Sequence, residues 1–432
     1  MKMANMDDYF DVVIVGTGAA GLYCALNLPA RYRILLLTKQ KADESDSFIA
    51  QGGICMQHGE ADYRPFFDDT MRAGHYENNP ATVDLMIRSS NSIIRDLVRR
   101  GVRFARDDHG ALRFTREGAH SRPRILFHED ITGHEITQTL LNEVLRCENI
   151  ELREHTTLLD FFADASACGG VIAADPDGEP QAIGAGSVVL ACGGIGGLYK
   201  NSTNFPHITG DAIAMALRHG VACEHLDYIQ IHPTTLYSHR KGRRFLISES
   251  VRGEGALLLD KNGNRFTNEL QPRDVVSAAI RAQMEKDGTD HVWEDMRPIG
   301  EAAIREHFPN ILERCEEEGY DPIHEPIPVV PAQHYFMGGI TADLSSRTAL
   351  PRLYACGETC CNGVHGRNRL ASNSLLESLV FAQRAADDIL YGEPPVFTGD
   401  KPDLAPYREQ EPLFAAYRQE VLTAIERSKN HE

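Results

Sequence analysis

The sequence lacks several features that would point to particular classes of protein. It has no overall excess of basic residues, since the net charge is −18, which argues against nucleic acid or an anionic membrane as a general partner. The longest apolar runs, such as residues 12–15 and 187–191, have the length of strands and cannot span a bilayer. No basic and apolar leader precedes the first predicted strand. We therefore expect a cytoplasmic protein that binds neither nucleic acid nor membrane.

Cysteine pairs with Cys-x-x-Cys spacing are also absent, although the chain contains 10 cysteines. We expect reduced, mostly buried thiols, and we predict no metal site. The sequence shows no internal repeat. Its 432 residues, of which 42% are hydrophobic, indicate a globular protein with two or three structural units.

The first forty residues contain a nucleotide-binding pattern. A buried-strand run at 11–15 is followed by Gly16-Thr17-Gly18-Ala19-Ala20-Gly21, a helical segment at 22–28 and a second strand at 34–37. This order is typical of the dinucleotide-binding βαβ unit, in which the glycines allow a tight turn and the close approach of a pyrophosphate. The second strand ends in Thr38-Lys39, where an acidic residue would bind a ribose. The pattern alone therefore does not identify the dinucleotide.

Two later segments resemble the first strand. Residues 187–194 form an apolar run that ends in Gly193-Gly194, and residues 353–358 form another that ends in Gly357-Glu358. We interpret all three as parallel strands that lead to one ligand at their carboxyl ends. The dinucleotide domain is therefore predicted to be discontinuous.

The segment between residues 225 and 333 has a different pattern. Residues 228–234 alternate with period two, Asn262-Gly263 indicates a hairpin between 257–260 and 265–267, and helices are predicted at 275–284 and 301–318. We interpret this segment as an inserted domain that covers the ligand. The last forty residues contain a proline-rich linker and one helix at 412–427; the linker prolines are Pro394, Pro395, Pro402 and Pro406.

The predicted fold class is α/β. It comprises a discontinuous Rossmann-like domain at 1–224 and 334–393, an α+β capping domain at 225–333, and a linker with a short C-terminal helical tail at 394–432.

A polar loop follows the third strand. After Gly357-Glu358 it carries Arg367 and Arg369, and it enters a helix that begins near Ser372-Asn373-Ser374. A helix start presents free N–H donors and a positive dipole end. The loop therefore suits a large, polar and partly anionic ligand. Residues 47–54 form either a backbone-rich loop against a flat ring system or an ordinary glycine turn.

Taken together, these segments resemble the succinate dehydrogenase and fumarate reductase flavoprotein superfamily, and within it the family of L-aspartate oxidases. The resemblance runs from the first strand to about residue 390. It is carried by the polar loop and by Ala50-Gln51-Gly52-Gly53, Thr209-Gly210-Asp211, His232-Pro233-Thr234, Arg252-Gly253-Glu254-Gly255, Arg273-Asp274 and His334-Tyr335-Phe336-Met337-Gly338-Gly339.

The segment Thr115-Arg116-Glu117-Gly118-Ala119-His120-Ser121 separates the oxidases from their relatives in this resemblance. A carboxylate beside a dicarboxylate pocket would repel succinate unless a cation lay between them, and the ammonium group of aspartate is such a cation. Glu117 is therefore expected to face the substrate amine, although a surface carboxylate is the alternative. Ala119 stands where these oxidases usually have glycine, which affects backbone freedom in the loop.

The resemblance implies the roles of the remaining polar residues. Arg273 is expected to transfer a proton, with Glu249 and Arg252 as its relay, while a set of side chains binds the substrate: Glu117, Gln230, His232, Ser248, His334 and Arg369. Arg273 lies just after Pro272 at a predicted helix start, where a cation is disfavoured by about 0.3–1 kcal/mol. A cation at such a position is more readily explained by a functional role of Arg273 than by a surface salt bridge with Glu269 or Asp274. The basic run Arg240, Lys241, Arg243 and Arg244 is interpreted as a solvated loop.

The cofactor implied by the resemblance is FAD. The residues expected to contact it are Gly16, Thr17, Gly18, Ala19, Ala20, Gly21, Lys39, Ser45, Ser47, Phe48, Ala50, Gln51, Gly52, Gly53, Ala191, Gly193, Gly194, Asp211, Glu358, Asn373, Ser374 and Leu375. Membrane-bound relatives attach the flavin through a histidine, and this chain has Asp46 at that position. We therefore expect non-covalent FAD and reoxidation by a soluble acceptor.

The implied reaction is the oxidation of L-aspartate to iminoaspartate, with reoxidation by O2, which gives H2O2, or by fumarate, which gives succinate. It would begin de novo NAD biosynthesis, with iminoaspartate passed to quinolinate synthase. The alternatives are a soluble fumarate reductase or succinate dehydrogenase flavoprotein, and a binding protein without catalysis. The chain is expected to be a short form that lacks most of the C-terminal helical domain of many family members.

Overall fold

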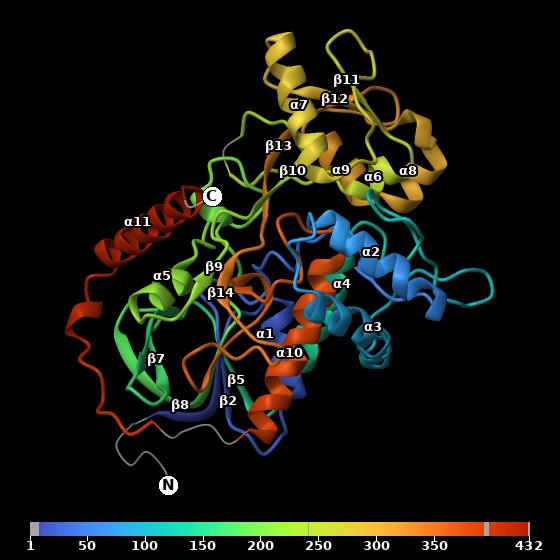
Figure 1. The fold of residues 1–432 in the computed structure, drawn as a ribbon. Helices are drawn as coiled ribbons and strands as arrows, with labels where there is room; N and C mark the ends of the chain where they lie inside the picture. Colours follow the sequence, from blue (N-terminus) through green and yellow to red (C-terminus); the bar gives the residue numbers. More distant parts are fainter. Residues whose placement is uncertain (1–7, 241, 393–396, 431–432) are drawn as a thin grey trace.

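The computed structural model describes residues 8–240, 242–392 and 397–430. They form two parts joined by two long strands (Figure 1). The larger part, which we call the main domain, contains a seven-stranded sheet. The smaller part, which we call the cap, contains a four-stranded sheet and stands above one end of the main domain. Pro394 and Pro395 of the predicted linker lie outside the described residues.

Parallel strands form the centre of the main sheet. They are β5 (Ile150–Arg153), β2 (Ile34–Leu37), β1 (Tyr9–Val15) and β8 (Pro180–Leu190), with β15 (Leu353–Ala355) paired to β8. Val15 is in register with both Leu37 and Leu190, and Leu190 is in register with Ala355. The carboxyl ends of these strands therefore lie in one line, which is where open α/β sheets bind their ligands.

Strand β8 also belongs to an antiparallel section of the same sheet. Its first half pairs with β7 (Cys168–Ala174), which pairs in turn with β6 (Thr157–Ala163). Gly184 is in register with Tyr9 of β1 on one side and with Gly170 of β7 on the other.

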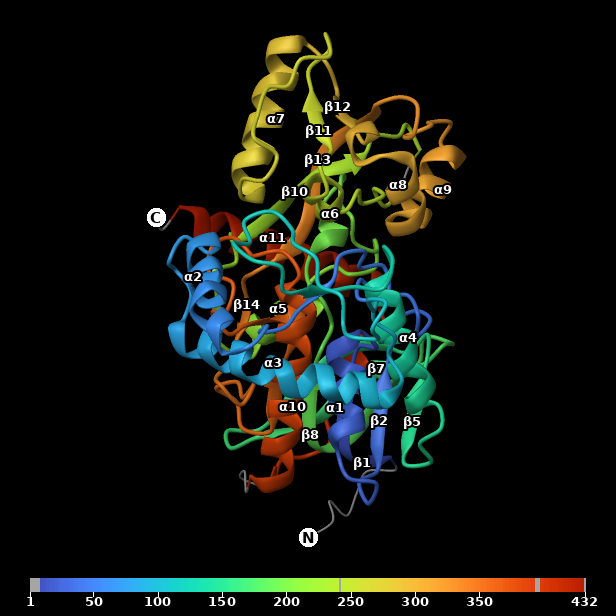
Figure 2. The same ribbon diagram turned by 90° about the vertical axis from the view of Figure 1, so that its right-hand side faces the viewer.

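Helices cover both faces of the sheet. Because successive side chains of a strand point to opposite faces, Val12 and Ile14 of β1 join one hydrophobic core and Val13 and Val15 join another. The first core contains α1 (Ala19–Asn27), α3 (Pro80–Arg100), α4 (Thr132–Val144) and α10 (Asn373–Tyr391), with α2 (Tyr63–Ala73) beside α3 (Figure 2). The second contains α5 (Asp211–Arg218) and α11 (Gln410–Lys429), which lie side by side.

The cap has its own hydrophobic core. Its antiparallel sheet has the order β10 (Ile229–Leu236), β13 (Ile327–Phe336), β12 (Val292–Asp295) and β11 (Leu257–Leu259), and its helices are α6 (Glu249–Gly253), α7 (Arg273–Asp287), α8 (Glu301–His307) and α9 (Pro309–Glu317). Strands β10 and β13 carry the chain into and out of the cap. The domain boundaries at 225 and 333 stay a prediction.

Two local predictions for the cap were wrong. The helix expected at 301–318 is divided into α8 and α9, because Pro309 begins a new helix, a position that proline favours. The hairpin at Asn262-Gly263 does form its turn, but its second strand is reduced to a single bridge between Leu259 and Arg265. Strand β11 pairs with β12 instead.

Short strands complete the main domain. β3 (Ile54–Cys55) pairs with β4 (Ile125–Leu126), and β14 (Gly339–Thr341) pairs with β9 (Cys223–Glu224) and β16 (Cys360–Cys361). All 10 cysteines are free thiols and most are buried, as predicted. Within the described residues no cluster of metal-ligating side chains occurs.

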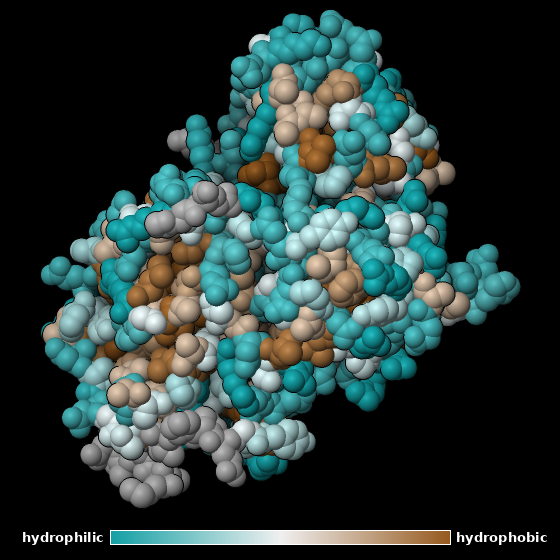
Figure 3. Space-filling view, viewed as in Figure 1, coloured by the Kyte–Doolittle hydropathy of each residue, from teal (hydrophilic) through white to brown (hydrophobic). Residues whose placement is uncertain are grey.

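The visible surface gives no sign of a large apolar face. In the view of Figure 3 most side chains are hydrophilic, and the hydrophobic ones lie in small separate groups on both the main domain and the cap. Among the described residues, no helix has the length and apolar character needed to cross a bilayer.

Candidate active site

One long cavity extends from the carboxyl ends of the central strands to the underside of the cap. It collects most of the predicted site residues, which come from segments far apart in the sequence. The predicted residues that line it are Gly16, Thr17, Gly18, Ala20, Lys39, Ser45, Ser47, Ala50, Gln51, Gly52, Gly53, Glu117, Ala191, Gly193, Asp211, His232, Ser248, Glu249, Arg273, His334, Glu358, Arg369, Ser374 and Leu375.

Other predicted site residues lie behind the cavity wall and support it. They are Ala19, Gly21, Phe48, Gly194, Gln230, Arg252 and Asn373. The backbone N–H of Ala19 donates to Ser47 Oγ at 3.1 Å. A Cβ on Gly21 would lie 1.9 Å from the carbonyl oxygen of Gly16. These residues therefore shape the turn and the helix start without themselves lining the cavity.

The turn between β1 and α1 is built for close approach of a ligand. Gly16 has φ +114°, and a Cβ there would lie 2.0 Å from the carbonyl oxygen of Ala191. Only glycine fits this contact between neighbouring strands. The N-terminus of α1 follows directly and offers N–H donors to an anion, which fits the pyrophosphate of a dinucleotide.

Unpartnered polar atoms mark the middle of the cavity. Within the described part of the chain, Ser45 Oγ, Asp46 Oδ2, Gln51 Oε1 and Arg369 Nε are buried without a hydrogen-bond partner. Buried polar atoms are costly unless a partner satisfies them. All four residues line the cavity, so a large ligand with donors and acceptors fits this set.

Lys39 lies at the end of the cavity next to β2. Its Nζ is 2.7 Å from Asp211 Oδ2, and it lies 4.8 Å from the ring centre of Phe414 on α11. Thr209 donates to the other oxygen of Asp211 at 2.7 Å. The C-terminal helix thus reaches the end of the cavity that Lys39 lines. Sequence reasoning missed Phe414, because the residues of this helix do not show where it will pack.

Two partly buried carboxyl groups, those of Glu358 and Asp46, line the cavity. Burial, together with the nearby charge of Asp46, raises the pKa of Glu358 to about 8, and Glu358 Oε1 accepts a hydrogen bond from the N–H of Phe336 at 2.9 Å. Burial also raises the pKa of Asp46 to about 7, while Asp46 Oδ1 accepts from the N–H of Phe205 at 2.9 Å.

The prediction of a solvated loop at 240–244 was wrong for Arg243. Arg243 lines the cavity and donates to the carbonyl oxygen of Thr203 at 3.4 Å. Arg244 donates to Asn201 Oδ1 at 3.1 Å. Arg243 thus belongs to the cavity wall, whereas Arg244 stays partly exposed. Arg240 is exposed, as predicted, and Lys241 lies outside the described residues.

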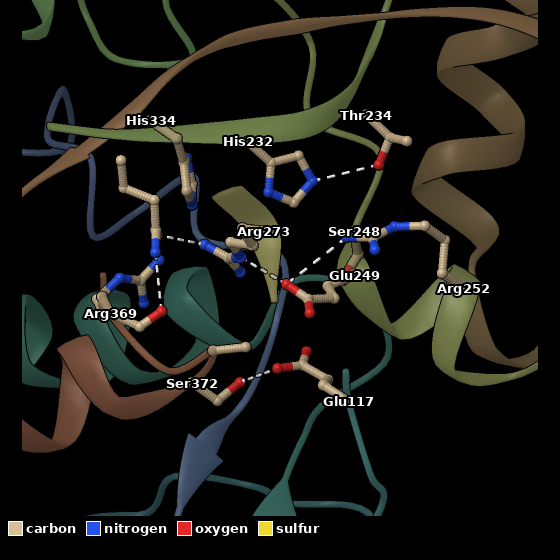
Figure 4. Close-up of polar contacts among 12 residues, drawn as sticks. Glu117, His232, Thr234, Ser248, Glu249, Arg252, Arg273, His334, Arg369 and Ser372 are labelled. Atoms are coloured by element: carbon tan, nitrogen blue, oxygen red, sulfur yellow. Dashed lines mark hydrogen bonds and ion pairs between the residues drawn. The ribbon is translucent and has the colours of Figure 1, made fainter. Parts of the chain in front are cut away.

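The three residues predicted to move a proton are in contact. Arg273 Nε donates to Glu249 Oε2 at 2.5 Å, and Arg252 Nη2 lies 3.7 Å from the same oxygen (Figure 4). Burial alone would raise the pKa of Glu249, but the guanidinium groups of Arg273 and Arg252 offset this and hold its pKa below the ordinary value. Glu249 is therefore an anion between two cations.

The contacts of Arg273 exclude a surface salt bridge with Glu269 or Asp274, which was the alternative to a role in the site. Its ion-pair partner is Glu249, whereas Glu269 pairs with an arginine on its own segment and Asp274 pairs with His75. Arg273 Nη1 also donates to Gln230 Oε1 at 2.7 Å. Gln230 was predicted to bind substrate, but it lies behind the wall and orients Arg273 instead.

A cluster of nitrogen donors lies above and beside Arg273. The ring centres of His232 and His334 are 5.1 Å apart, and Arg369 donates to Ser374 Oγ at 2.8 Å. Burial and the charge of Arg273 hold the pKa of both histidines well below the ordinary value. Burial, with the charge of Arg273, also lowers the pKa of Arg369 to about 10. Guanidinium and imidazole donors at this density suit a ligand with two carboxylates.

Glu117 lies on the opposite side of Arg273 from the two histidines (Figure 4). It is buried, so the alternative of a surface carboxylate is excluded. Burial and then the charge of Glu249 raise the pKa of its carboxyl group. Ser250 and Ser372 each donate a hydrogen bond to it, at 2.7 Å and 2.6 Å. The cavity therefore combines the cationic cluster around Arg273 with the carboxylate of Glu117, which lies apart from Arg369 and the two histidines.

Ala119 adopts a conformation that favours glycine. Its φ is +65°, in the left-handed region, and its N–H donates to the carbonyl oxygen of Leu270 in the cap. A non-glycine residue pays about 1 kcal/mol there. Replacing Ala119 by glycine is expected to raise the free energy of unfolding by about 0.5–1 kcal/mol, because relief of strain exceeds the added chain entropy. Urea unfolding of the Ala119→Gly variant and of the unmodified protein measures this difference in free energy. A variant less stable than the unmodified protein would contradict the prediction.

Comparison with known families identifies the class of protein. Residues 11–375 match the family model described as FAD binding domain. A quinol-fumarate reductase with menaquinol molecules has a similar structure, with a TM-score of 0.84, 32% sequence identity and coverage of 95% of this chain and 75% of that one. The Mycobacterium smegmatis Sdh1 in complex with UQ1 is also similar, with a TM-score of 0.75, 31% identity and coverage of 90% and 70%. The fold and site define an FAD-binding flavoprotein, as predicted.

Sequence relatives narrow this class further. The L-aspartate oxidase of Clostridium perfringens is 48% identical over 380 residues, which are 88% of this chain and 86% of that protein. The L-aspartate oxidase of Nostoc sp. is 44% identical over 442 residues, covering 98% of this chain and 76% of that one. The chain belongs to the L-aspartate oxidase family.

Proposed function

We propose that this protein oxidises L-aspartate to iminoaspartate with FAD as its cofactor. The observation that carries the proposal is the buried carboxylate of Glu117, set apart from the cluster of Arg369 and the two histidines. That cluster suits the two carboxylates of the substrate, and Glu117 suits its ammonium group. A dicarboxylate without an amine would give Glu117 no ammonium group to bind.

The residues of the cavity would hold FAD without a covalent bond. The β1–α1 turn and the start of α1 suit the pyrophosphate, the paired Lys39 and Asp211 would lie toward the adenosine, and Glu358 suits the ribityl chain. Asp46 stands at the position of the attaching histidine in membrane-bound relatives, and a carboxyl group does not form that bond. When bound, FAD supplies the two-electron acceptor for the hydride from C2 of the substrate.

The protein orients the substrate for this transfer. His232, His334 and Arg369 would bind the carboxylates, and Glu117 would hold the amine, so that C2 has one fixed orientation. Fixing a reactant in this way lowers the entropic part of the barrier. The low pKa of both histidines keeps the free cavity from gaining further positive charge beside Arg273.

Arg273 would carry the proton when fumarate is the acceptor. Its guanidinium would give a proton to a fumarate carbon, and a proton from solvent would return to it through Glu249 Oε2, which contacts both Arg273 and Arg252. Fumarate gains a hydride and a proton in this step and becomes succinate. Arginine rarely loses a proton, so the exchange depends on direct return of a proton through Glu249, which contacts Arg273.

The wider role is also a proposal. An iminoaspartate-forming enzyme would supply quinolinate synthase in de novo NAD biosynthesis, in the cytoplasm, with O2 or fumarate as the acceptor. The net charge of −18 supports small molecules rather than nucleic acid as its partners.

An absorbance spectrum of the purified protein tests the function. We expect a yellow protein whose flavin absorbance bleaches on addition of L-aspartate without oxygen and returns with fumarate. Bleaching by succinate but not by L-aspartate would favour the alternative, a soluble fumarate reductase or succinate dehydrogenase flavoprotein. A colourless protein that takes up no FAD would favour a binding protein without catalysis.

A further inference from the structure

Two serine hydroxyl groups hold the carboxylate of Glu117 from opposite sides. Ser250 Oγ donates to Glu117 Oε1 at 2.7 Å, and Ser372 Oγ donates to Glu117 Oε2 at 2.6 Å. Each oxygen of the carboxylate thus has its own donor. Neither serine was predicted to contact Glu117, because these contacts join segments 133 and 255 residues apart.

Further hydrogen bonds direct both hydroxyl protons toward Glu117. The N–H of Gly53 donates to Ser372 Oγ at 3.1 Å, and Ser248 Oγ donates to Ser250 Oγ at 3.2 Å. A hydroxyl has one proton and two lone pairs. Because each serine oxygen accepts a hydrogen bond from another group, its single proton is left for the carboxylate.

The local charges explain why Glu117 needs these donors. It is buried, and the anionic Glu249 lies nearby, so both burial and charge favour the protonated form. Hydrogen bonds to a carboxylate favour the ionised form. The two serines are therefore the groups that oppose loss of its charge, aided by the positive charge of Arg273.

The serines come from the two parts of the molecule. Ser250 is on α6 of the cap, whereas Ser372 precedes α10 in the main domain and has φ +62°. The bond of Ser250 to Glu117 requires the cap to lie against the main domain. Without that contact between cap and main domain, Ser372 alone would donate to Glu117, and only one oxygen of the carboxylate would accept a hydrogen bond.

We propose that Ser250 and Ser372 are positioning residues that keep Glu117 ionised and aimed at the substrate amine, and that Ser250 links this state to docking of the cap. The inference rests on the proposed function, because it assigns the preference for an amino dicarboxylate over the same dicarboxylate without an amine. The serines act through Glu117 and need not touch the substrate.

Kinetics of Ser250→Ala and Ser372→Ala test the inference. With L-aspartate as substrate, we expect KM to rise by roughly tenfold in each variant, because a hydrogen bond to a charged group is lost. The inhibition constant of succinate, which has no amine, should stay the same or fall. The acid limb of the kcat/KM profile should move to higher pH by about one unit, since Glu117 then loses its charge at higher pH.

Matched variants separate positioning from a loss of folding. Ser250→Thr keeps a hydroxyl and should restore most of the affinity for L-aspartate. Ser277→Ala and Ser346→Ala remove buried hydroxyls that donate to Ile231 and Phe381 carbonyl groups, and should leave KM unchanged. If Ser372→Ala does not fold, Ser250→Ala alone carries the test.

The possible results separate the inference from the proposed function. If the unmodified protein does not oxidise L-aspartate, the proposed function fails. If the unmodified protein does oxidise L-aspartate, two results would contradict the inference. One is that the alanine variants bind L-aspartate and succinate more weakly by the same factor, and the other is that the acid limb of their pH profile does not move. The serines would then have a structural role only.

Discussion

Replacing Arg273 by glutamine is expected to lower kcat for L-aspartate oxidation with fumarate as the acceptor by about a thousandfold, within the range of a lost proton-transfer group. Glutamine removes both the cation proposed to face the substrate and the ion pair with Glu249. The FAD content should not change, since the contacts of Arg273 are with Glu249 and Gln230 near the cap. Steady-state turnover and the flavin absorbance of the purified variant measure the two effects.

Two further variants control this experiment. Arg273→Lys keeps the charge but not the planar guanidinium that contacts Glu249 and Gln230, so most of the loss should remain. Arg281→Gln removes an exposed arginine from the same helix and should stay within about twofold of the unmodified protein. An Arg273→Gln variant that kept a tenth of the original kcat would exclude Arg273 as the proton carrier.

Replacing Glu117 by glutamine is expected to raise KM for L-aspartate by roughly 10- to 100-fold, because a charge-assisted bond of about 1.5–3 kcal/mol is lost. Succinate and fumarate should bind at least as well as before, since a negative charge near their carboxylates is gone. The variant should therefore move the protein toward the specificity of a fumarate reductase. KM for L-aspartate and for fumarate, measured with the same preparation, give the comparison.

The pH profile adds an independent test of Glu117. The pKa of its carboxyl group is raised by burial and by Glu249, and the ammonium group needs the anion. Activity with L-aspartate should therefore fall as pH falls through this raised pKa, and this acid limb should be absent in Glu117→Gln. Glu313→Gln, on the exposed side of α9, is the control variant and should keep the acid limb of the profile. An unchanged profile in Glu117→Gln would exclude this role.

The local parts of the fold followed from the sequence. The turn from Gly16 to Gly21 lies between a buried strand and a helix, and each of these elements is defined by neighbours in the chain. The two strands that end at Leu190 and Ala355 could be added because their pattern and their glycines repeat the first. Where two local signals competed, as at Pro309, the helix boundary was misplaced.

The candidate site was predicted less completely. The contact of Arg273 with Glu249 followed from the family resemblance, but the place of Gln230 behind the wall did not. Arg243 was interpreted as solvated because a basic run usually is, and its bond to Thr203 depends on how the cap lies on the main domain. The sequence could not show this, because the two segments meet only in the folded chain.

By itself, the sequence determined the class of fold, the presence of a dinucleotide site and the residue types of the substrate site, since these depend on short patterns and on residue chemistry. Tertiary structure decided which side chains share a cavity and in which charge state they are held. Glu117 is the clearest case: Ser372 meets it through folding of the main domain, and Ser250 meets it only through packing of the cap on that domain. Burial and neighbouring charge, which set its pKa, exist only after that packing.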